Sequence, residues 1–168
     1  VILVKSTGGA GLGDSIRSLL SALHYAKVSG RSLSVCWDDG LYGEKGANIF
    51  PYLFRLVDIP FVDLNELCEE NVLPIAWRCQ LDSPMNELYA LLRDDDWNRA
   101  WALDNLSFDQ CRFDYEESVL VMWDFDGLAT SWMATNPAYR IGVTPDDALR
   151  IIAMNHLRPS LAILAEVE

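Results

Sequence analysis

The chain has 168 residues, of which 51% are apolar and 11% aromatic, and its formal net charge is −12. The aromatic content excludes a disordered chain, because so much ring surface must be buried. The acidic charge excludes free nucleic acid as a partner. No apolar run is as long as a transmembrane helix requires, so we expect no transmembrane segment.

The first 37 residues predict a strand, a glycine-rich turn, a helix and a second strand. The near-continuous apolar run of residues 1–6 is typical of a strand buried on both faces of a parallel sheet. Apolar residues then recur at helical spacing, and we expect Asp14 to cap this helix and Gly30 to end it. With the second strand at residues 32–37, this order forms a βαβ unit with parallel strands.

The rest of the chain predicts short helices and strands that alternate after a polar loop at residues 38–46. The expected helices are residues 51–56, 63–70, 84–93, 94–105, 144–156 and one that begins at Ser160. The expected strands are residues 61–62 and 118–123, and Arg158-Pro159 is expected only to break the preceding helix. This alternation predicts an α/β fold: one Rossmann-like three-layer domain over residues 1–168, with a mainly parallel sheet.

The four cysteines are widely spaced, and no C-x-x-C pair occurs. A structural zinc site usually takes its ligands in close pairs, so the spacing argues against zinc. We expect buried free thiols instead, in a reducing, cytoplasmic setting.

The turn between the first strand and the helix is the main candidate site, with the sequence Ser-Thr-Gly-Gly-Ala-Gly-Leu-Gly-Asp over residues 6–14. Glycines let the backbone pass close to a ligand, and the N–H groups at a helix start favour anions. It is not a Walker A loop, and Ala10 takes the middle position of an otherwise matching G-x-G-x-x-G. A tight strand-to-helix turn without a ligand is the alternative.

We also expect Gly11 or Gly13 to adopt a backbone conformation closed to residues with a Cβ atom, or to approach another backbone segment closely. Either constraint predicts that Gly13→Val destabilises the fold, by about 1–3 kcal/mol of local strain.

A second candidate is the Asp124-Phe125-Asp126 segment that follows an apolar strand. Metal-dependent nucleotide-sugar transferases hold a divalent cation with such a D-x-D element. The segment also resembles the nucleophile motif of haloacid-dehalogenase-type phosphatases, but that motif lies on the first strand and needs a later lysine, which this chain lacks. A metal site and an ordinary pair of loop carboxylates both stay open.

The tryptophans are a third candidate, because aromatic faces stack on sugar rings. Most tryptophans in proteins are core or interface anchors, so we expect no more than a pair of them in a site. They are Trp37, Trp77, Trp97, Trp101, Trp123 and Trp132.

Residues 7–19, Thr-Gly-Gly-Ala-Gly-Leu-Gly-Asp-Ser-Ile-Arg-Ser-Leu, resemble the first turn and helix of the bacterial α1,6-fucosyltransferases that modify nodulation factors. The segments 25–27 (Tyr-Ala-Lys), 30–33 (Gly-Arg-Ser-Leu) and 48–51 (Asn-Ile-Phe-Pro) extend the resemblance. Near the end, residues 155–159 (Asn-His-Leu-Arg-Pro) are similar to the segment that precedes the second half of those enzymes.

The resemblance implies the N-terminal half of a two-domain GT-B glycosyltransferase that moves a sugar from GDP-fucose to a glycan acceptor without a metal ion. It implies a turn that faces the donor phosphates, formed by Gly8, Gly9, Gly11, Gly13, Asp14 and Arg17. It also implies an acceptor-side loop with Trp37, Asp38 and Asn48. Arg17 departs from the family's more apolar character at that position.

The family's His-x-Arg donor motif follows the Leu-Arg-Pro segment, and this chain stops there, so we expect the isolated chain to be inactive. No catalytic residue is assigned. The alternative is a non-catalytic α/β subunit or adaptor that binds another protein through its acidic, tryptophan-bearing surface.

Overall fold

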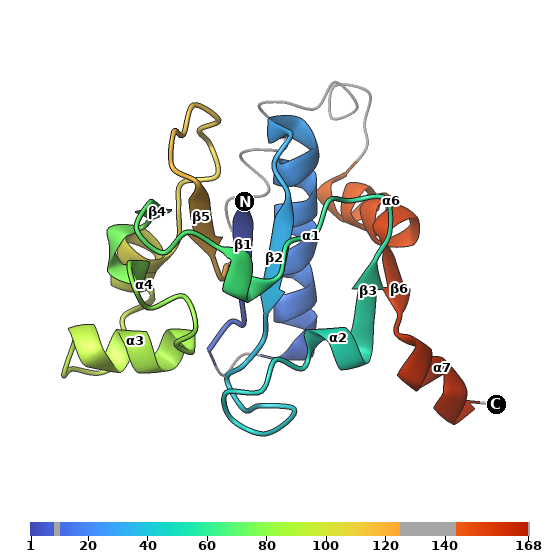
Figure 1. The fold of residues 1–168 in the computed structure, drawn as a ribbon, viewed down its shortest axis with the longest axis horizontal. Helices are drawn as coiled ribbons and strands as arrows, with labels where there is room; N and C mark the ends of the chain where they lie inside the picture. The colour runs from blue at the N-terminus through green and yellow to red at the C-terminus, as the bar shows by residue number, and fades with distance from the viewer. Residues whose placement is uncertain (9–10, 125–143, 168) are drawn as a thin grey trace.

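The computed structural model describes residues 1–8, 11–124 and 144–167. Its centre is a four-stranded parallel sheet in the order β2-β1-β5-β4 (Figure 1). The strands are β1 (Ile2–Lys5), β2 (Leu33–Cys36), β4 (Val72–Leu73) and β5 (Val119–Met122). Every residue of β1, β2 and β5 is buried, as their near-continuous apolar sequences predict for strands covered on both faces.

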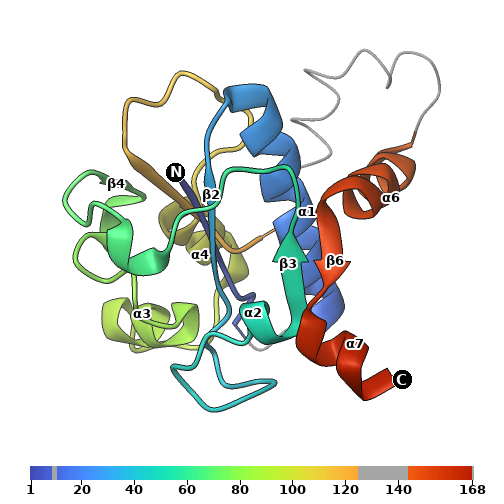
Figure 2. The ribbon, with the colours of Figure 1, turned by 45° about the vertical axis from the view of Figure 1, so that its right-hand side comes forward.

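Two layers of helices cover the sheet, because alternate strand residues point to opposite faces. Ile2 and Val4 pack in one core cluster with α1 (Leu12–Ser29) and α6 (Pro145–His156). Leu3 packs in the other with α3 (Met85–Leu92) and α4 (Arg99–Leu106). In Figure 2, α1 and α6 lie to the right of β1 and β2, and α3 lies to the left. The predicted three-layer α/β fold with a mainly parallel sheet is confirmed.

Helix α1 begins earlier than the sequence predicts. Its N-cap is Gly11 and not Asp14, and because glycine has no side chain, the N-cap residue makes no side-chain hydrogen bond to the helix. Asp14 lies instead in the first turn, where a carboxylate interacts well with the positive end of the helix. The predicted end is confirmed: Gly30 has φ 71°, the left-handed conformation that glycine adopts without strain.

A second, two-stranded antiparallel sheet, which the sequence analysis did not predict, pairs β3 (Phe54–Leu56) with β6 (Leu157–Pro159). The helix expected at residues 51–56 is one turn, α2 (Phe50–Leu53), followed at once by β3. Arg158-Pro159 does more than break a helix, since it pairs with Phe54 and Arg55 before α7 (Leu161–Val167) begins. Figure 1 shows β3 and β6 side by side, far from the main sheet's β4 edge.

The middle of the chain is more irregular than predicted. The helix expected at residues 63–70 is one 3₁₀ turn, η1 (Leu64–Glu66), and Asp63 makes no side-chain cap. Phe61 forms only an isolated bridge with Leu33. Strand β4 and the 3₁₀ turn η2 (Ile75–Trp77) were not predicted. Helix α4 begins at Arg99, because the Asn98 side chain accepts from the Trp101 N–H and fixes its start.

All four cysteines are free thiols, but only Cys36 is buried. Cys68, Cys79 and Cys111 are exposed, which corrects the expected burial. They lie in irregular segments between elements, where sequence patterns carry little information on burial. In the described part of the chain, no helix is long and apolar enough to cross a membrane.

Candidate functional site

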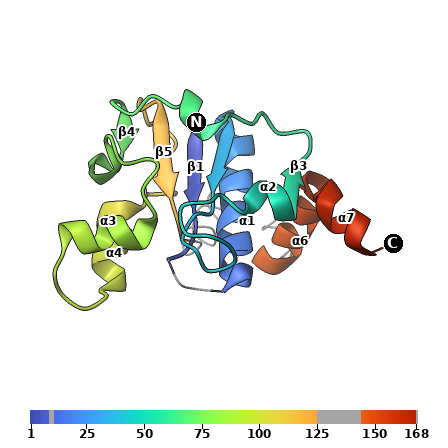
Figure 3. The ribbon, with the colours of Figure 1, turned by 60° about the horizontal axis from the view of Figure 1, so that its bottom comes forward.

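Three segments singled out by sequence follow the carboxyl ends of neighbouring strands. The glycine turn follows β1, the loop at residues 38–48 follows β2, and Asp124 lies two residues after the end of β5. Figure 3 brings this edge forward and shows the 38–48 loop in front of the strand ends. In open parallel sheets, ligands bind outside the carboxyl ends of the strands. The topology therefore brings the predicted donor-side and acceptor-side segments to one edge.

Gly8 is the glycine of the turn that the fold requires. Its φ is +62°, and a Cβ built there would lie 2.3 Å from Cε of Met85 on α3. Met85 is fully buried, so a side chain at position 8 would have to displace a core residue. Gly9 and Ala10 lie outside the described residues.

Gly11 and Gly13 carry neither constraint, so the expectation of a forced backbone at one of them is wrong. Neither has a positive φ, and a Cβ at either position would meet no atom within 4 Å. Both residues are exposed at the start of α1. The space beside these two glycines is open, so a ligand could approach the backbone closely there.

The 38–48 loop closes onto the glycine turn through one contact that sequence reasoning missed. The Leu12 N–H, at the first residue of α1, donates a 2.7 Å hydrogen bond to the Tyr42 hydroxyl. Inside the turn, the Thr7 and Ser15 hydroxyls lie 3.3 Å apart. Tyr42 thus satisfies one of the backbone N–H groups that a helix start leaves without an intrahelical acceptor.

A buried ion pair supports the turn from below. Lys5 Nζ lies 2.9 Å from Oδ2 of Asp38, and the two side chains are 0% and 2% exposed. The same ammonium donates to the Leu81 carbonyl at 3.3 Å and lies 3.3 Å from Cys36 Sγ. Burial raises the pKa of the Cys36 thiol to about 12, so this sulfur stays protonated. Asp38 faces the interior and ties the end of β2 to the end of β1.

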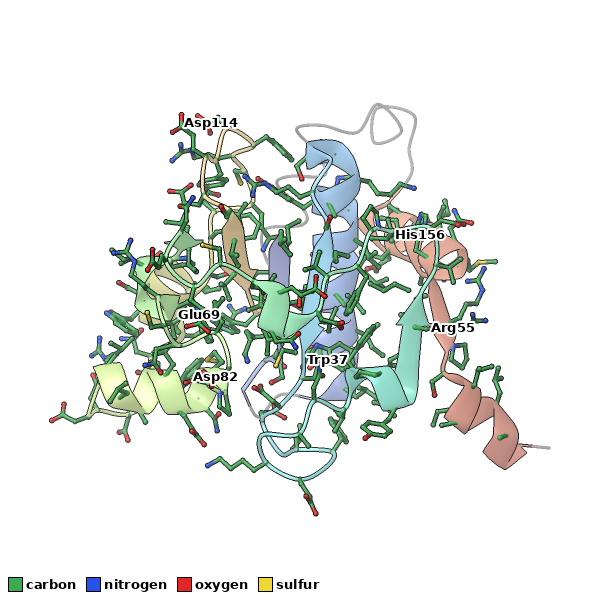
Figure 4. The ribbon with its side chains drawn as sticks, viewed as in Figure 1. Trp37, Arg55, Glu69, Asp82, Asp114 and His156 are labelled. Carbon is green, nitrogen blue, oxygen red and sulfur yellow. The ribbon has the colours of Figure 1, made fainter. Side chains whose placement is uncertain are left out.

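Trp37 and Asn48 also face inward. The Trp37 ring is buried with Phe50, at 5.3 Å between ring centroids, and Figure 4 shows it at the end of β2, above the loop. Asn48 Oδ1 accepts from the N–H groups of Trp37 and Phe50, and its Nδ2 donates to Val35 O. These contacts fix both ends of the loop. A direct role of Trp37, Asp38 or Asn48 in acceptor binding stays a prediction.

The outer face of the same loop forms a hollow of about 360 Å³. It is lined mainly by the loop and α2, with Tyr42, Glu44, Ile49 and Tyr52 among its residues. Beside it, Lys45 pairs with Glu87 of α3, and both side chains are largely exposed. On this outer face the Tyr42 side chain is exposed, whereas Trp37 and Asp38 are buried.

In the part of the chain that the structure describes, positive charge is sparse around the turn. Arg17 is exposed on α1, and Lys5 is buried and paired. The start of α1 adds the equivalent of about half a positive charge. Among the described residues, this edge therefore carries little positive charge that an anion could contact.

Asp124, the first carboxylate of the D-x-D segment, is buried and accepts a hydrogen bond from the Ser107 hydroxyl. Asp126 lies outside the described residues, so the paired-carboxylate hypothesis is untested. Among residues 1–8, 11–124 and 144–167, no group of three or more His, Cys, Asp or Glu side chains is placed to hold a metal ion.

The tryptophans divide as expected between the core and the surface. Trp37, Trp77 and Trp123 are buried, whereas the Trp97 side chain is 48% exposed. Trp132 lies outside the described residues. Trp97 lies against Trp123, the residue that directly follows β5, with 5.8 Å between the two ring centroids. One exposed tryptophan therefore reaches the edge that carries the glycine turn.

Comparison with known proteins supports the resemblance found in the sequence. No protein-family model matches the chain. It is 36% identical over 84 residues to Nodulation protein Z of Azorhizobium caulinodans, which covers 45% of this chain and 26% of that protein. The structure matches the fucosyltransferase NodZ from Bradyrhizobium with a TM-score of 0.60 and 24% identity, over 98% of this chain and 54% of that one.

A second solved structure, a NodZ α1,6-fucosyltransferase soaked with GDP-fucose, matches with a TM-score of 0.59 and 23% identity over 98% of this chain. The chain spans about half the length of these solved relatives. The similarity to nodulation fucosyltransferases inferred from the glycine turn is thereby confirmed, and the fold is that of a corresponding part of NodZ.

Proposed function

We propose that residues 1–168 form one Rossmann-like domain, the N-terminal half of a fucosyltransferase-like glycosyltransferase of GT-B architecture. In this proposal the chain faces the diphosphate of a GDP-sugar, with GDP-fucose as donor, and contributes to binding a glycan acceptor. The observation that carries the proposal is the match to NodZ over nearly the whole of this chain but about half of NodZ. The cysteines, none of them in a disulfide, favour action in the cytoplasm.

The donor side rests on the start of α1. Gly13 is exposed and has room for a Cβ, so folding alone gives no reason for glycine there. Anions bind well at a helix start, chiefly through the helix dipole here, because the Leu12 N–H already donates to Tyr42 and the Asp14 and Ser15 N–H groups donate to the Gly11 carbonyl. Arg17 adds an exposed guanidinium on the same helix. These groups would stabilise the charge that develops on the leaving phosphate as the glycosidic bond breaks.

The acceptor side rests on the 38–48 loop. Its hollow is polar at Tyr42 and Glu44 and apolar at Ile49 and Tyr52, which suits a sugar with hydroxyl groups and an apolar face. Asn48 and the Lys5–Asp38 pair hold the loop ends in place, so they act as positioning residues. A loop held in this way loses less conformational entropy when the acceptor binds, which favours binding.

The isolated chain is expected to transfer no sugar. It offers few cations at the proposed donor edge and carries a net charge of −12, which repels a nucleotide diphosphate. In the proposal, the other half of the enzyme supplies the missing cationic groups, and closure between the halves excludes water from the leaving phosphate. No metal ion is part of this mechanism.

A GDP-release assay with GDP-fucose and a chitooligosaccharide tests the proposal. The isolated chain should release GDP no faster than a blank, and a longer form that continues past Glu168 into a His-x-Arg segment should release it with acceptor dependence. An open reading frame that stops soon after Glu168 would contradict the enzyme and favour the adaptor. Transfer by the isolated chain would contradict the half-enzyme.

A further inference from the structure

An aromatic cluster, formed by Tyr89 of α3, Trp101 of α4, Trp97 between these helices and Trp123 after β5, leaves one ring open to solvent. Trp97 contacts Tyr89 at 4.6 Å and Trp123 at 5.8 Å between ring centroids. Trp101 packs edge-on against Tyr89 at 5.6 Å. Tyr89 and Trp123 are buried, whereas Trp97 is half exposed. The cluster is thus a supported surface rather than a closed core.

The Tyr89 hydroxyl holds the backbone on both sides of Trp97. It donates to the Asp96 carbonyl at 2.9 Å and accepts from the Asn98 N–H at 2.8 Å. Asn98 in turn caps α4 by accepting from the Trp101 N–H. These bonds hold the backbone on both sides of Trp97, and the contacts with the Tyr89 and Trp123 rings restrict its side chain. A fixed exposed ring binds a ligand at a smaller entropic cost.

The Trp97 platform, defined as the Trp97 ring with its supports Tyr89 and Trp123, lies near the glycine turn. Trp123 directly follows β5, the neighbour of β1 in the sheet. Met85, whose side chain abuts Gly8, lies one helical turn before Tyr89 on α3. The two features therefore share α3 as a common support along the same edge.

Two further observations point to a ligand with hydroxyl groups. The Trp123 indole N–H is buried and has no hydrogen-bond partner in the described part of the chain. A buried donor without an acceptor lowers stability, so the fold gains nothing from it. Exposed carboxylates of Asp94 and Asp96 precede Trp97 in the sequence, while Asp95 is paired with Arg93. An aromatic face with nearby carboxylates matches the apolar face and the hydroxyl rim of a pyranose.

We propose that the Trp97 platform binds one sugar ring of the glycan acceptor, at a subsite separate from the hollow of the 38–48 loop. The inference rests on the proposed function for the identity of the ligand as an acceptor. The sugar stacks on the Trp97 face, and the Asp94 and Asp96 carboxylates accept hydrogen bonds from its hydroxyl groups. Tyr89 is a positioning residue that acts through the backbone of residues 96–98.

The test is an NMR titration of the 168-residue chain with a β1,4-linked N-acetylglucosamine tetramer, following the indole N–H signals. We expect the Trp97 signal to shift on titration. Trp97→Ala should weaken binding about tenfold, and Trp97→Phe, which keeps a ring, should weaken it less. Tyr89→Phe should weaken binding while leaving the stacking surface unaltered, because it removes only the hydroxyl that fixes the loop.

Phe61→Ala is the matched control, since Phe61 is also an exposed aromatic residue but lies beside Leu33, at the amino end of β2. It should bind the tetramer as the parent chain does. Equal binding by the parent and Trp97→Ala chains, with unchanged thermal melting, would overturn the inference. Tighter binding of a trimethylammonium probe than of the tetramer would also overturn it, because the platform would then be a cation site.

An error in the proposed function would give a different result from an error in the Trp97 platform. If the chain is not a transferase half, GDP leaves the amide signals of the glycine turn unchanged, whatever the tetramer does at Trp97. Sugar binding that depends on Trp97 without any GDP response would keep the platform and remove the acceptor assignment.

Discussion

Gly8 and Gly13 lie five residues apart in one turn, and the structure predicts opposite effects when each is replaced by alanine. At Gly8, an alanine would adopt φ +62° and place Cβ 2.3 Å from Cε of buried Met85. The left-handed backbone costs on the order of 1 kcal/mol. Only the terminal methyl of the buried Met85 side chain has to move, which adds about 1 kcal/mol, the low end of the usual cost of overpacking. We therefore expect Gly8→Ala to lower the free energy of unfolding by about 2 kcal/mol.

At Gly13 the same substitution meets open space, within the first turn of α1. Alanine is favoured over glycine in a helix, so Gly13→Ala should raise the free energy of unfolding by about 0.5–1 kcal/mol. This reverses the sign that the sequence alone predicted for a substitution at this position. If the turn faces a diphosphate, the same stabilised variant should bind GDP more weakly, because a methyl group would enter the ligand's approach.

Urea denaturation followed by circular dichroism measures both changes as shifts of the midpoint at constant slope. If Gly13→Ala is more stable than the parent chain and Gly8→Ala is less stable, Gly8 is the constrained residue and Gly13 is not. Equal destabilisation by both substitutions would refute it, since Gly13 would then carry a constraint that the backbone does not show.

Two further predictions concern buried ionisable groups. Lys5→Met leaves the Asp38 carboxylate buried without its partner, so we expect a loss of about 3–5 kcal/mol by urea denaturation. The double variant Lys5→Met/Asp38→Leu should recover much of that loss, and a double variant as unstable as the single one would contradict the ion-pair account. Burial lowers the pKa of His24 to about 4, from an ordinary value of 6.5, so the unfolded chain takes up a proton before the folded chain does. Stability contributed by neutral His24 is complete above pH 6.5 and falls as the pH drops towards 4. In thermal melts taken between pH 6.5 and 4, His24→Leu should reduce the fall in melting temperature. An unchanged pH profile would contradict this role of His24.

The elements that sequence predicted well are those fixed by local patterns. The run from Ile2 to Lys5 is apolar throughout, as a strand covered on both faces must be, and the spacing of apolar residues marks α1 up to Gly30. Strand β5 was found for the same reason, and helix α6 was found from its start signal, the N-cap Thr144 followed by Pro145. Each signal lies within one element and needs no partner.

The elements that were missed depend on partners far away in sequence. Strand β3 exists because Arg55 pairs with Arg158, about 100 residues later, and a short strand at Pro159 looks like a helix break without that partner. Strand β4 has two residues, too few for any periodicity. The local sequence at these positions is compatible with several conformations, and only the tertiary pairing selects one.

The glycine turn and the 38–48 loop could be singled out from the sequence, but the orientation of their side chains could not. The glycine turn and the 38–48 loop do meet at one edge of the sheet. Which glycine is constrained depends on the approach of Met85 from α3, which the turn's own sequence does not contain. Asp38 reads as a loop carboxylate, and the strand register that sets Lys5 beside Cys36 turns it inward. Tyr42, which closes the loop onto α1, had no sequence signal.

The proposal that the turn faces a nucleotide diphosphate has one direct test, an NMR titration of the isotope-labelled 168-residue chain with GDP. The account predicts that the backbone amide signals of residues 11–15 shift and saturate only in the millimolar range, equivalent to a binding free energy of about −4 kcal/mol. Amide signals there that stay unchanged while others move would contradict the donor-facing turn. Saturation at micromolar GDP would contradict the half-enzyme, because a complete donor site would then lie within these residues.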